Sequence, residues 1–163
     1  LNRNVMEYPE SIEVQKEVYK LHLKRVREPF EDLVKVVEPE WIIWAQDTIA
    51  REVEVPMDVL DYVVLLIRNS RPKIFPPIAE YFELGASPRA GINLLKAAKA
   101  YAALNGKNVV DREDVDEILF PVLNHRLIPN FEKLIELEAK GEKFIARYSL
   151  IREGIEYLKK HFG

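Results

Sequence analysis

The strongest constraint on the fold is a segment in which both ends of a long helix are marked. Ser87 predicts an N-cap, because its hydroxyl can accept a hydrogen bond from the first turn, and Pro88 suits the first helical position. Asn105-Gly106 predicts the end, because glycine readily adopts the left-handed conformation that closes a helix. The sequence therefore predicts a helix over 88–104.

Helical patterns fill most of the remaining chain. Apolar residues recur three or four positions apart, and proline, glycine or a capping residue bounds each run. With only 6 glycines and 48% hydrophobic residues among 163, the composition favours a compact helical protein over a disordered one. The predicted fold class is all-α. The other expected helices cover 11–27, 40–52, 58–67, 111–121, 130–140 and 148–161, with an irregular stretch over 72–84.

Composition also excludes several functional classes. The chain has no cysteine, which rules out a disulfide scaffold, a thiolate zinc site and a thiol nucleophile. Its 24 basic and 27 acidic residues give a net charge of -3, too little for bulk attraction to nucleic acid or anionic lipid. The longest apolar stretches are about half of the ~20 residues that span a bilayer. We expect no nucleic-acid partner, no membrane span and a cytoplasmic location.

The sequence contains no recognisable metal-binding or catalytic motif. His22, His125 and His161 are far apart and lack the spacing of metal ligands. Gly106-Lys107 is the only Gly-Lys pair, but Asn108 stands where a phosphate-binding loop needs a hydroxyl. We therefore predict no metal site and no catalytic residue in this chain.

The helices on either side of Gly106 could be mistaken for a helix-turn-helix unit. In that motif the second helix enters the major groove of DNA. Here the second helix is acidic, and the phosphate backbone would repel it. We do not expect it to read DNA. Its acidic residues are Asp111, Glu113, Asp114, Asp116 and Glu117.

The start of the 88–104 helix is a candidate anion site. A helix N-terminus presents free backbone N–H groups and the positive end of the helix dipole, and Arg89 adds a guanidinium. Helical spacing places Arg89, Asn93 and Lys96 on a polar face. It places these residues on an apolar face: Ile92, Leu95, Ala98 and Ala102. Arg89 is therefore expected to point away from the core. A capped helix with a surface arginine is the simpler interpretation.

A series of sequence blocks, taken together, resembles a known family. The blocks are Val55-Pro56, Leu60-Asp61-Tyr62-Val63, Ile67-Arg68 to Arg71, Leu84-Gly85-Ala86-Ser87-Pro88-Arg89-Ala90, Leu94-Leu95-Lys96-Ala97-Ala98-Lys99-Ala100, Asp114-Val115 and Pro121-Val122-Leu123-Asn124-His125-Arg126-Leu127. In this order and spacing they resemble the C-terminal helical lid of MoxR-family AAA+ ATPases. Related lids occur in magnesium-chelatase ATPase subunits and, more distantly, in replicative helicases. The resemblance covers 8–127, within a single lid domain over 1–163 in which 128–163 is a C-terminal helical extension.

The resemblance implies a role for the start of the 88–104 helix. Arg89 would be the sensor 2 arginine, which contacts the γ-phosphate of ATP, with Ser87 and Pro88 at the helix N-terminus beside the nucleotide. Mg-ATP would be held mainly by a core domain. Family members form hexameric homo-oligomers whose ATP hydrolysis drives chaperone-like remodelling of a partner. The implied partners are thus the core domain, neighbouring ring subunits and a client protein that the sequence does not identify.

The chain departs from the family in one respect, since it contains neither a Walker A nor a Walker B motif. We expect it to be inactive alone, although its parent protein would be an ATPase. It begins at Leu1 without a methionine, and we interpret it as a fragment. The alternative is a free-standing helical adaptor that binds a protein through its C-terminal helices without nucleotide. Ring size and the role of 128–163 stay open, and His125 and Arg126 are expected to be structural, through capping or pairing with an acid.

Overall fold

The computed structural model describes residues 11–23, 33–140 and 145–163. The chain divides into two units, 1–38 and 39–163. The described helix of the first unit is α1 (Ile12–Leu23), which contains no buried residue. It confirms the start of the predicted 11–27 helix, whose last residues lie outside the described ranges.

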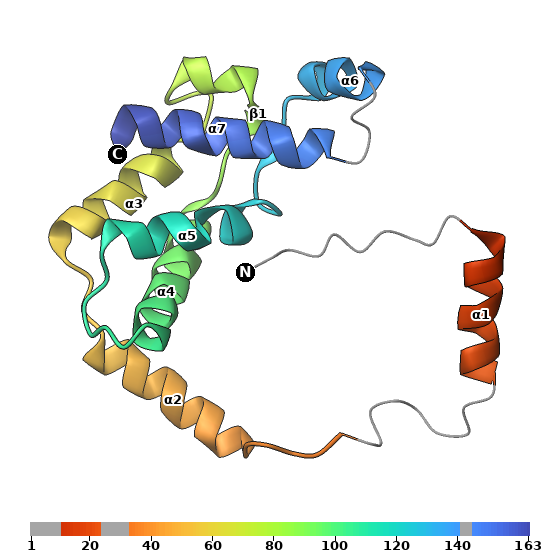
Figure 1. The fold of residues 1–163 in the computed structure, drawn as a ribbon. Helices are drawn as coiled ribbons and strands as arrows, with labels where there is room; N and C mark the ends of the chain where they lie inside the picture. The colour runs from red at the N-terminus through yellow and green to blue at the C-terminus, as the bar shows by residue number, and fades with distance from the viewer. Residues whose placement is uncertain (1–10, 24–32, 141–144) are drawn as a thin grey trace. The chain divides into compact units, whose positions relative to one another are not determined.

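The second unit is all-α, as predicted, with one small addition. The addition is an antiparallel pair of very short strands, β1 and β2, which sequence periodicity did not reveal. Figure 1 shows the helices as a ribbon coloured from the N-terminus to the C-terminus. The elements are α2 (Pro39–Glu52), α3 (Met57–Asn69), the 3-10 helix η2 (Pro76–Glu80), β1 (Phe82–Leu84), α4 (Pro88–Leu104), α5 (Arg112–Leu123), β2 (Ile128–Pro129), α6 (Phe131–Ala139) and α7 (Ala146–Phe162).

Helix α4 is the centre of this unit, packing against α2, α3 and α5. Its core stripe consists of small residues and one leucine, so the neighbouring helices can approach its backbone closely. Ala98 and Ala102 are fully buried, as predicted. Ile92 was expected on the same face but is 56% exposed, because the stripe is rotated towards Ala90, Gly91 and Leu94.

Helix α7 completes the core from the C-terminal end of the chain. It lies across α3 and contacts α5, η2 and α6 as well (Figure 1). Ile151, Ile155 and Leu158 belong to the same buried cluster as the residues of α4. Gly154 faces the ring of Phe82 so closely that a Cβ would overlap it. A methyl group at this position would push α7 away from β1.

Helix α5 begins as its sequence predicted and ends later. We predicted an end near Pro121, but the helix continues to Leu123 with this proline inside it. Proline removes one backbone hydrogen bond, the one that would reach Glu117. Because Glu117 is exposed, water can satisfy its carbonyl, and the last turn survives.

The start of α5 is held by a capping box formed by Asp111 and Asp114. The Asp111 side chain accepts a hydrogen bond from Asp114 N at 2.9 Å, and the Asp114 side chain accepts one from Asp111 N at 3.0 Å. Lys107 Nζ lies 2.6 Å from an oxygen of Asp111 and 2.7 Å from one of Asp114. This ammonium and then the Asp114 N–H lower the pKa of Asp111 below its ordinary 3.8.

This pKa direction predicts a pH-dependent contribution to stability. A carboxyl whose pKa is lower in the folded state stabilises the fold above its unfolded pKa, near 3.8, and loses that effect as pH falls through the folded value. Asparagine also caps helices, so Asp111→Asn removes the charge and keeps the cap. We expect the difference in unfolding free energy from the wild type, measured by urea denaturation, to be largest at neutral pH and to shrink below 3.8. An equal difference in unfolding free energy at neutral and strongly acidic pH would contradict this prediction. The control is Asp61→Asn, which removes a carboxylate from an exposed position of α3.

Helix α2 departs most from expectation. Its two tryptophans have the spacing of a buried face, yet Trp41 is 54% exposed and Trp44 is 59% exposed, with their ring centroids 6.4 Å apart. The helix is attached through its C-terminal half, where Ile49 meets the core and Lys99 Nζ donates to Ala50 O at 2.6 Å. The tryptophans lie in the other half, and no residue of α2 is fully buried.

Candidate functional site

The start of α4 is fastened to the end of α3 by hydrogen bonds. Ser70 Oγ accepts from Ala86 N at 2.9 Å and donates to Ile67 O at 2.8 Å. Arg71 Nε donates to Ala86 O at 3.0 Å. Both backbone groups of Ala86, which is fully buried, are therefore satisfied by residues that end α3. The arrangement fixes the position of the turn that precedes α4.

A glycine makes this close approach possible. A Cβ on Gly85 would overlap the carbonyl of Ser70 and crowd the backbone N of Arg71. In the sequence, Gly85, Ser70 and Arg71 were only parts of the blocks that resemble the family, and no contact between them was predicted. The hydrogen-bonding side chains at the end of α3 were the available signal, but their partner lies 15 and 16 residues away.

The first turn of α4 faces solvent. Ser87 occupies the N-cap position with an extended backbone, and Pro88 occupies the first helical position, both as predicted. The Ser87 hydroxyl makes no hydrogen bond to the first turn, so the predicted side-chain cap is wrong. Ser87, Pro88 and Arg89 are all exposed, and within the described ranges the structure records no ion pair for Arg89. With respect to the described residues, this turn therefore presents a hydroxyl and a guanidinium without partners.

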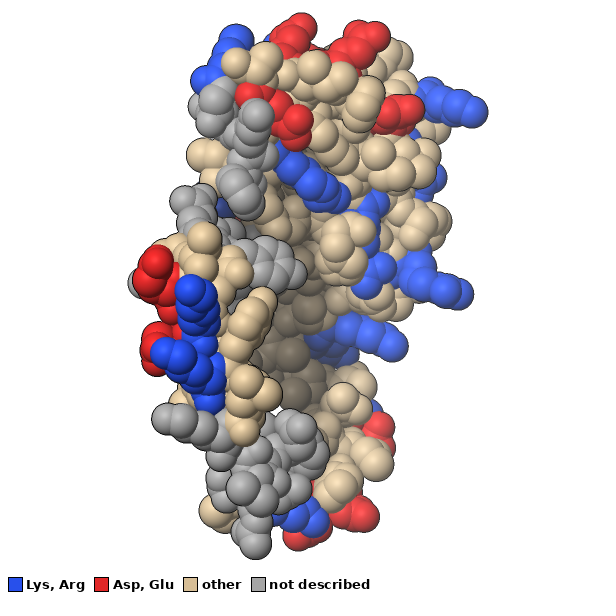
Figure 2. All heavy atoms as spheres, turned by 90° about the vertical axis from the view of Figure 1, so that its right-hand side faces the viewer, with Lys and Arg blue, Asp and Glu red and all other residues tan. Residues whose placement is uncertain are grey.

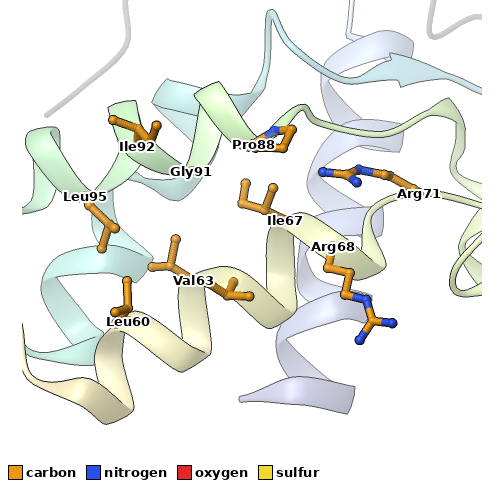
Figure 3. Close-up of a pocket in the computed structure, with 10 residues that line it drawn as sticks. Leu60, Val63, Ile67, Arg68, Arg71, Pro88, Gly91, Ile92 and Leu95 are labelled. Atoms are coloured by element: carbon orange, nitrogen blue, oxygen red, sulfur yellow. The ribbon is translucent and has the colours of Figure 1, made fainter.

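An apolar pocket of about 240 Å³ lies beside this turn, between α3 and α4 (Figure 3). Pro88, Gly91 and Ile92 line it from α4, which explains the exposure of Ile92. Gly91 lets the helices approach, since a Cβ there would lie 3.3 Å from Ile67 Cγ1. Arg68 and Arg71 are at one end of the pocket (Figure 3). An apolar surface bordered by cationic groups suits a ligand that is part apolar and part anionic.

Comparisons with known proteins agree with this geometry. Residues 78–143 match the AAA lid domain family. The chain is 30% identical over 139 residues to the uncharacterized protein YeaC of Bacillus subtilis, covering 85% of this chain and 39% of that protein. It is 31% identical over 81 residues to the chaperone MoxR1 of Mycobacterium tuberculosis, covering 48% of this chain and 22% of that protein.

A solved structure is similar as well. A candidate ATPase from Cytophaga hutchinsonii superposes with a TM-score of 0.57 at 27% identity, over 90% of this chain and 43% of that chain. The chain thus spans less than half the length of each of these relatives. In the described part of the chain, no helix is both long and apolar enough to cross a membrane.

Proposed function

Because this chain carries an AAA lid domain of the MoxR type, as its sequence motifs predicted, we propose that it is the nucleotide-sensing lid of an AAA+ ATPase. The observation that carries the proposal is the first turn of α4. It leaves Arg89 exposed and without an ion pair in the described residues, on a turn fixed to α3 through Ala86. A sensing arginine needs both properties, freedom to reach the ligand and a rigid base.

Arg89 is the sensor 2 residue in this proposal, and it contacts the γ-phosphate of ATP. A guanidinium suits this role because its planar fork bonds two phosphate oxygens and stays charged at physiological pH. Ser87 and Pro88 form the helix N-terminus beside the nucleotide, where the helix dipole favours an anion. Loss of the γ-phosphate removes a charge-assisted contact, so the lid can change its angle to the core domain.

The remaining components lie outside this chain. In the proposal, a core domain binds most of Mg-ATP, and neighbouring subunits of a hexameric ring receive the change in lid angle. The ring then remodels a client protein as a chaperone does, in the cytoplasm. The ATPase relatives support nucleotide use, and the name of MoxR1 supports the chaperone role.

Calorimetric titration tests the proposal. We expect ATP and a non-hydrolysable analogue to bind weakly or not at all to this chain alone. In the presence of the AAA+ core domain of the same protein, we expect both to bind, and Arg89→Ala to weaken that binding about tenfold through loss of a charge-assisted contact. Equal nucleotide affinity of the core with and without this chain would overturn the lid assignment.

One observation favours the alternative, a helical adaptor without nucleotide. Helix α6 in the C-terminal region has no buried residue and leaves Phe131 64% exposed and Ile135 50% exposed. Such residues suit a protein interface. The same titration separates the two functions, because an adaptor changes no nucleotide affinity.

A further inference from the structure

A second surface lies further along α4 and is unrelated to its first turn. We call it the α2–α4–α5 groove; it has a volume of about 750 Å³, within the usual range of ligand-binding pockets. Lys96 lies seven residues beyond Arg89, about 10 Å along the helix axis. The groove is lined by Gln46, Asp47, Ile49, Ala50, Asn93, Lys96, Ala97, Lys99, Ala100, Pro121, Val122, His125 and Arg126.

The groove gathers positive charge. Lys96, Lys99 and Arg126 carry permanent charges at neutral pH, His125 is a fourth basic group, and Asp47 is the acid among the lining residues. This balance contrasts with the net charge of -3 of the whole chain. In the right-hand part of Figure 2, Lys and Arg side chains gather in the middle, and acidic side chains lie above and below them.

The cations of the groove lack carboxylate partners in the described residues. Lys99 Nζ donates to the carbonyl of Ala50, and no ion pair is recorded for Lys96, His125 or Arg126. Two structural roles were expected for His125 and Arg126, capping or pairing with an acid, and no pairing with an acid is present among the described residues. Among the other described lysines, five have such partners and four do not: Lys20, Lys35, Lys107, Lys133 and Lys159 are paired, and Lys16, Lys73, Lys140 and Lys160 are not.

Arg126, one of the lining residues, is not fully hydrogen-bonded within the described part of the chain. Arg126 Nε is buried and has no hydrogen-bond acceptor among the described residues. A buried donor without an acceptor is costly, so a structure keeps one mainly where something else supplies the acceptor. A carboxylate is the side-chain group that best matches a guanidinium.

We propose that the α2–α4–α5 groove binds an acidic segment of a partner protein. Aspartate or glutamate carboxylates pair with Lys96 and Arg126, and the aliphatic parts of the segment lie on Ile49, Ala97 and Val122. A peptide fits better than nucleic acid, which needs an extended basic surface, because the N-terminal turn of α5 is acidic. The inference goes beyond nucleotide sensing, since it assigns this chain a protein-binding surface of defined charge.

Fluorescence anisotropy with this 163-residue chain tests the groove. The probe is a fluorescein-labelled peptide of ten glutamates, with a labelled peptide of ten glutamines for comparison. We expect the glutamate peptide to bind and the glutamine peptide not to bind. The affinity for the glutamate peptide should fall as the salt concentration is raised, since screening weakens exposed ion pairs. Absence of binding by the glutamate peptide at low salt would overturn the proposal.

Charge-matched variants locate the binding. Lys96→Gln with Arg126→Gln should raise the Kd for the glutamate peptide about tenfold, because both proposed contacts are lost. Lys73→Gln with Lys160→Gln removes the same charge from exposed positions outside the groove and should change Kd less than about twofold. Equal losses in the two double variants would mean that only net charge matters, and the site would be wrong.

A misfolded variant loses affinity, so a variant that binds more tightly gives a test that misfolding cannot imitate. Asp47→Asn removes the acid from the groove and should lower Kd about threefold, whereas Asp61→Asn should have no effect. The glutamate peptide should also shift the imidazole NMR signals of His125 and not those of His22 or His161. Unmoved His125 signals, or tighter binding of a ten-nucleotide oligo-dT through the same side chains, would overturn the assignment to an acidic peptide.

Discussion

Replacing Arg89 by alanine is expected to lower ATP turnover of the assembled ATPase about 100-fold, equivalent to about 2.7 kcal/mol of lost transition-state stabilisation. The reason is that the guanidinium would meet the charge that develops on the transferring phosphate. Stability of the chain should barely change, because Arg89 is exposed and has no recorded ion pair in the described residues. Steady-state phosphate release and thermal unfolding measure the two effects.

Two further substitutions make this prediction specific. Arg89→Lys keeps the charge but loses the planar fork, so it should restore only part of the turnover. Lys73→Ala removes a cation from an exposed position between α3 and η2 and should leave turnover unchanged. Wild-type turnover in the Arg89→Ala enzyme would show that this arginine does not contact the phosphate.

Substitution of Gly85 by alanine is expected to destabilise the 39–163 unit by about 3 kcal/mol, the upper end of typical overpacking costs. The added methyl group would overlap backbone atoms of Ser70 and Arg71, which have no freedom to rotate away. Relief of the overlap must lengthen the hydrogen bonds that join Ala86 to Ser70 and Arg71. Urea denaturation followed by circular dichroism measures the change.

A second glycine provides the matched control. Gly106 has a φ of 72°, and a Cβ added there would meet no other atom within 4 Å, so Gly106→Ala costs only the strain of a left-handed alanine, about 1 kcal/mol. If Gly85→Ala costs no more stability than Gly106→Ala, the overlap with Ser70 does not have the predicted effect. Under conditions where the Gly85→Ala variant is still folded, it should no longer increase the nucleotide affinity of the core domain, since the start of α4 is displaced.

Local sequence signals predicted the helices and their ends well. The limits of α4 followed from Pro88 and from Asn105-Gly106, and the start of α5 followed from the spacing of Asp111 and Asp114. These signals work because each depends on atoms within one helical turn. The same locality explains why Arg89 could be predicted as exposed and the start of α4 as a candidate anion site.

Features that depend on distant contacts could not be predicted in this way. Nothing near Gly85 in the sequence reveals that Ser70 lies against it, and the exposure of Ile92 depends on how α3 approaches α4. Trp41 and Trp44 have the spacing of a buried face, yet α2 contacts the core only through its other half. The short β1–β2 pair joins segments that are distant in the sequence.

By itself, the sequence determined an all-α chain, both ends of α4 and the start of α5, and the motifs that relate it to an AAA+ lid. Hydrophobic periodicity and capping are properties of neighbouring residues, so they can be read without knowledge of the fold. The tertiary structure alone decided the anchoring of Ala86 by Ser70 and Arg71 and the grouping of Lys96 with Arg126 in one groove. Those arrangements arise from the packing of helices far apart in the chain, where side-chain shape and backbone approach decide which surfaces meet.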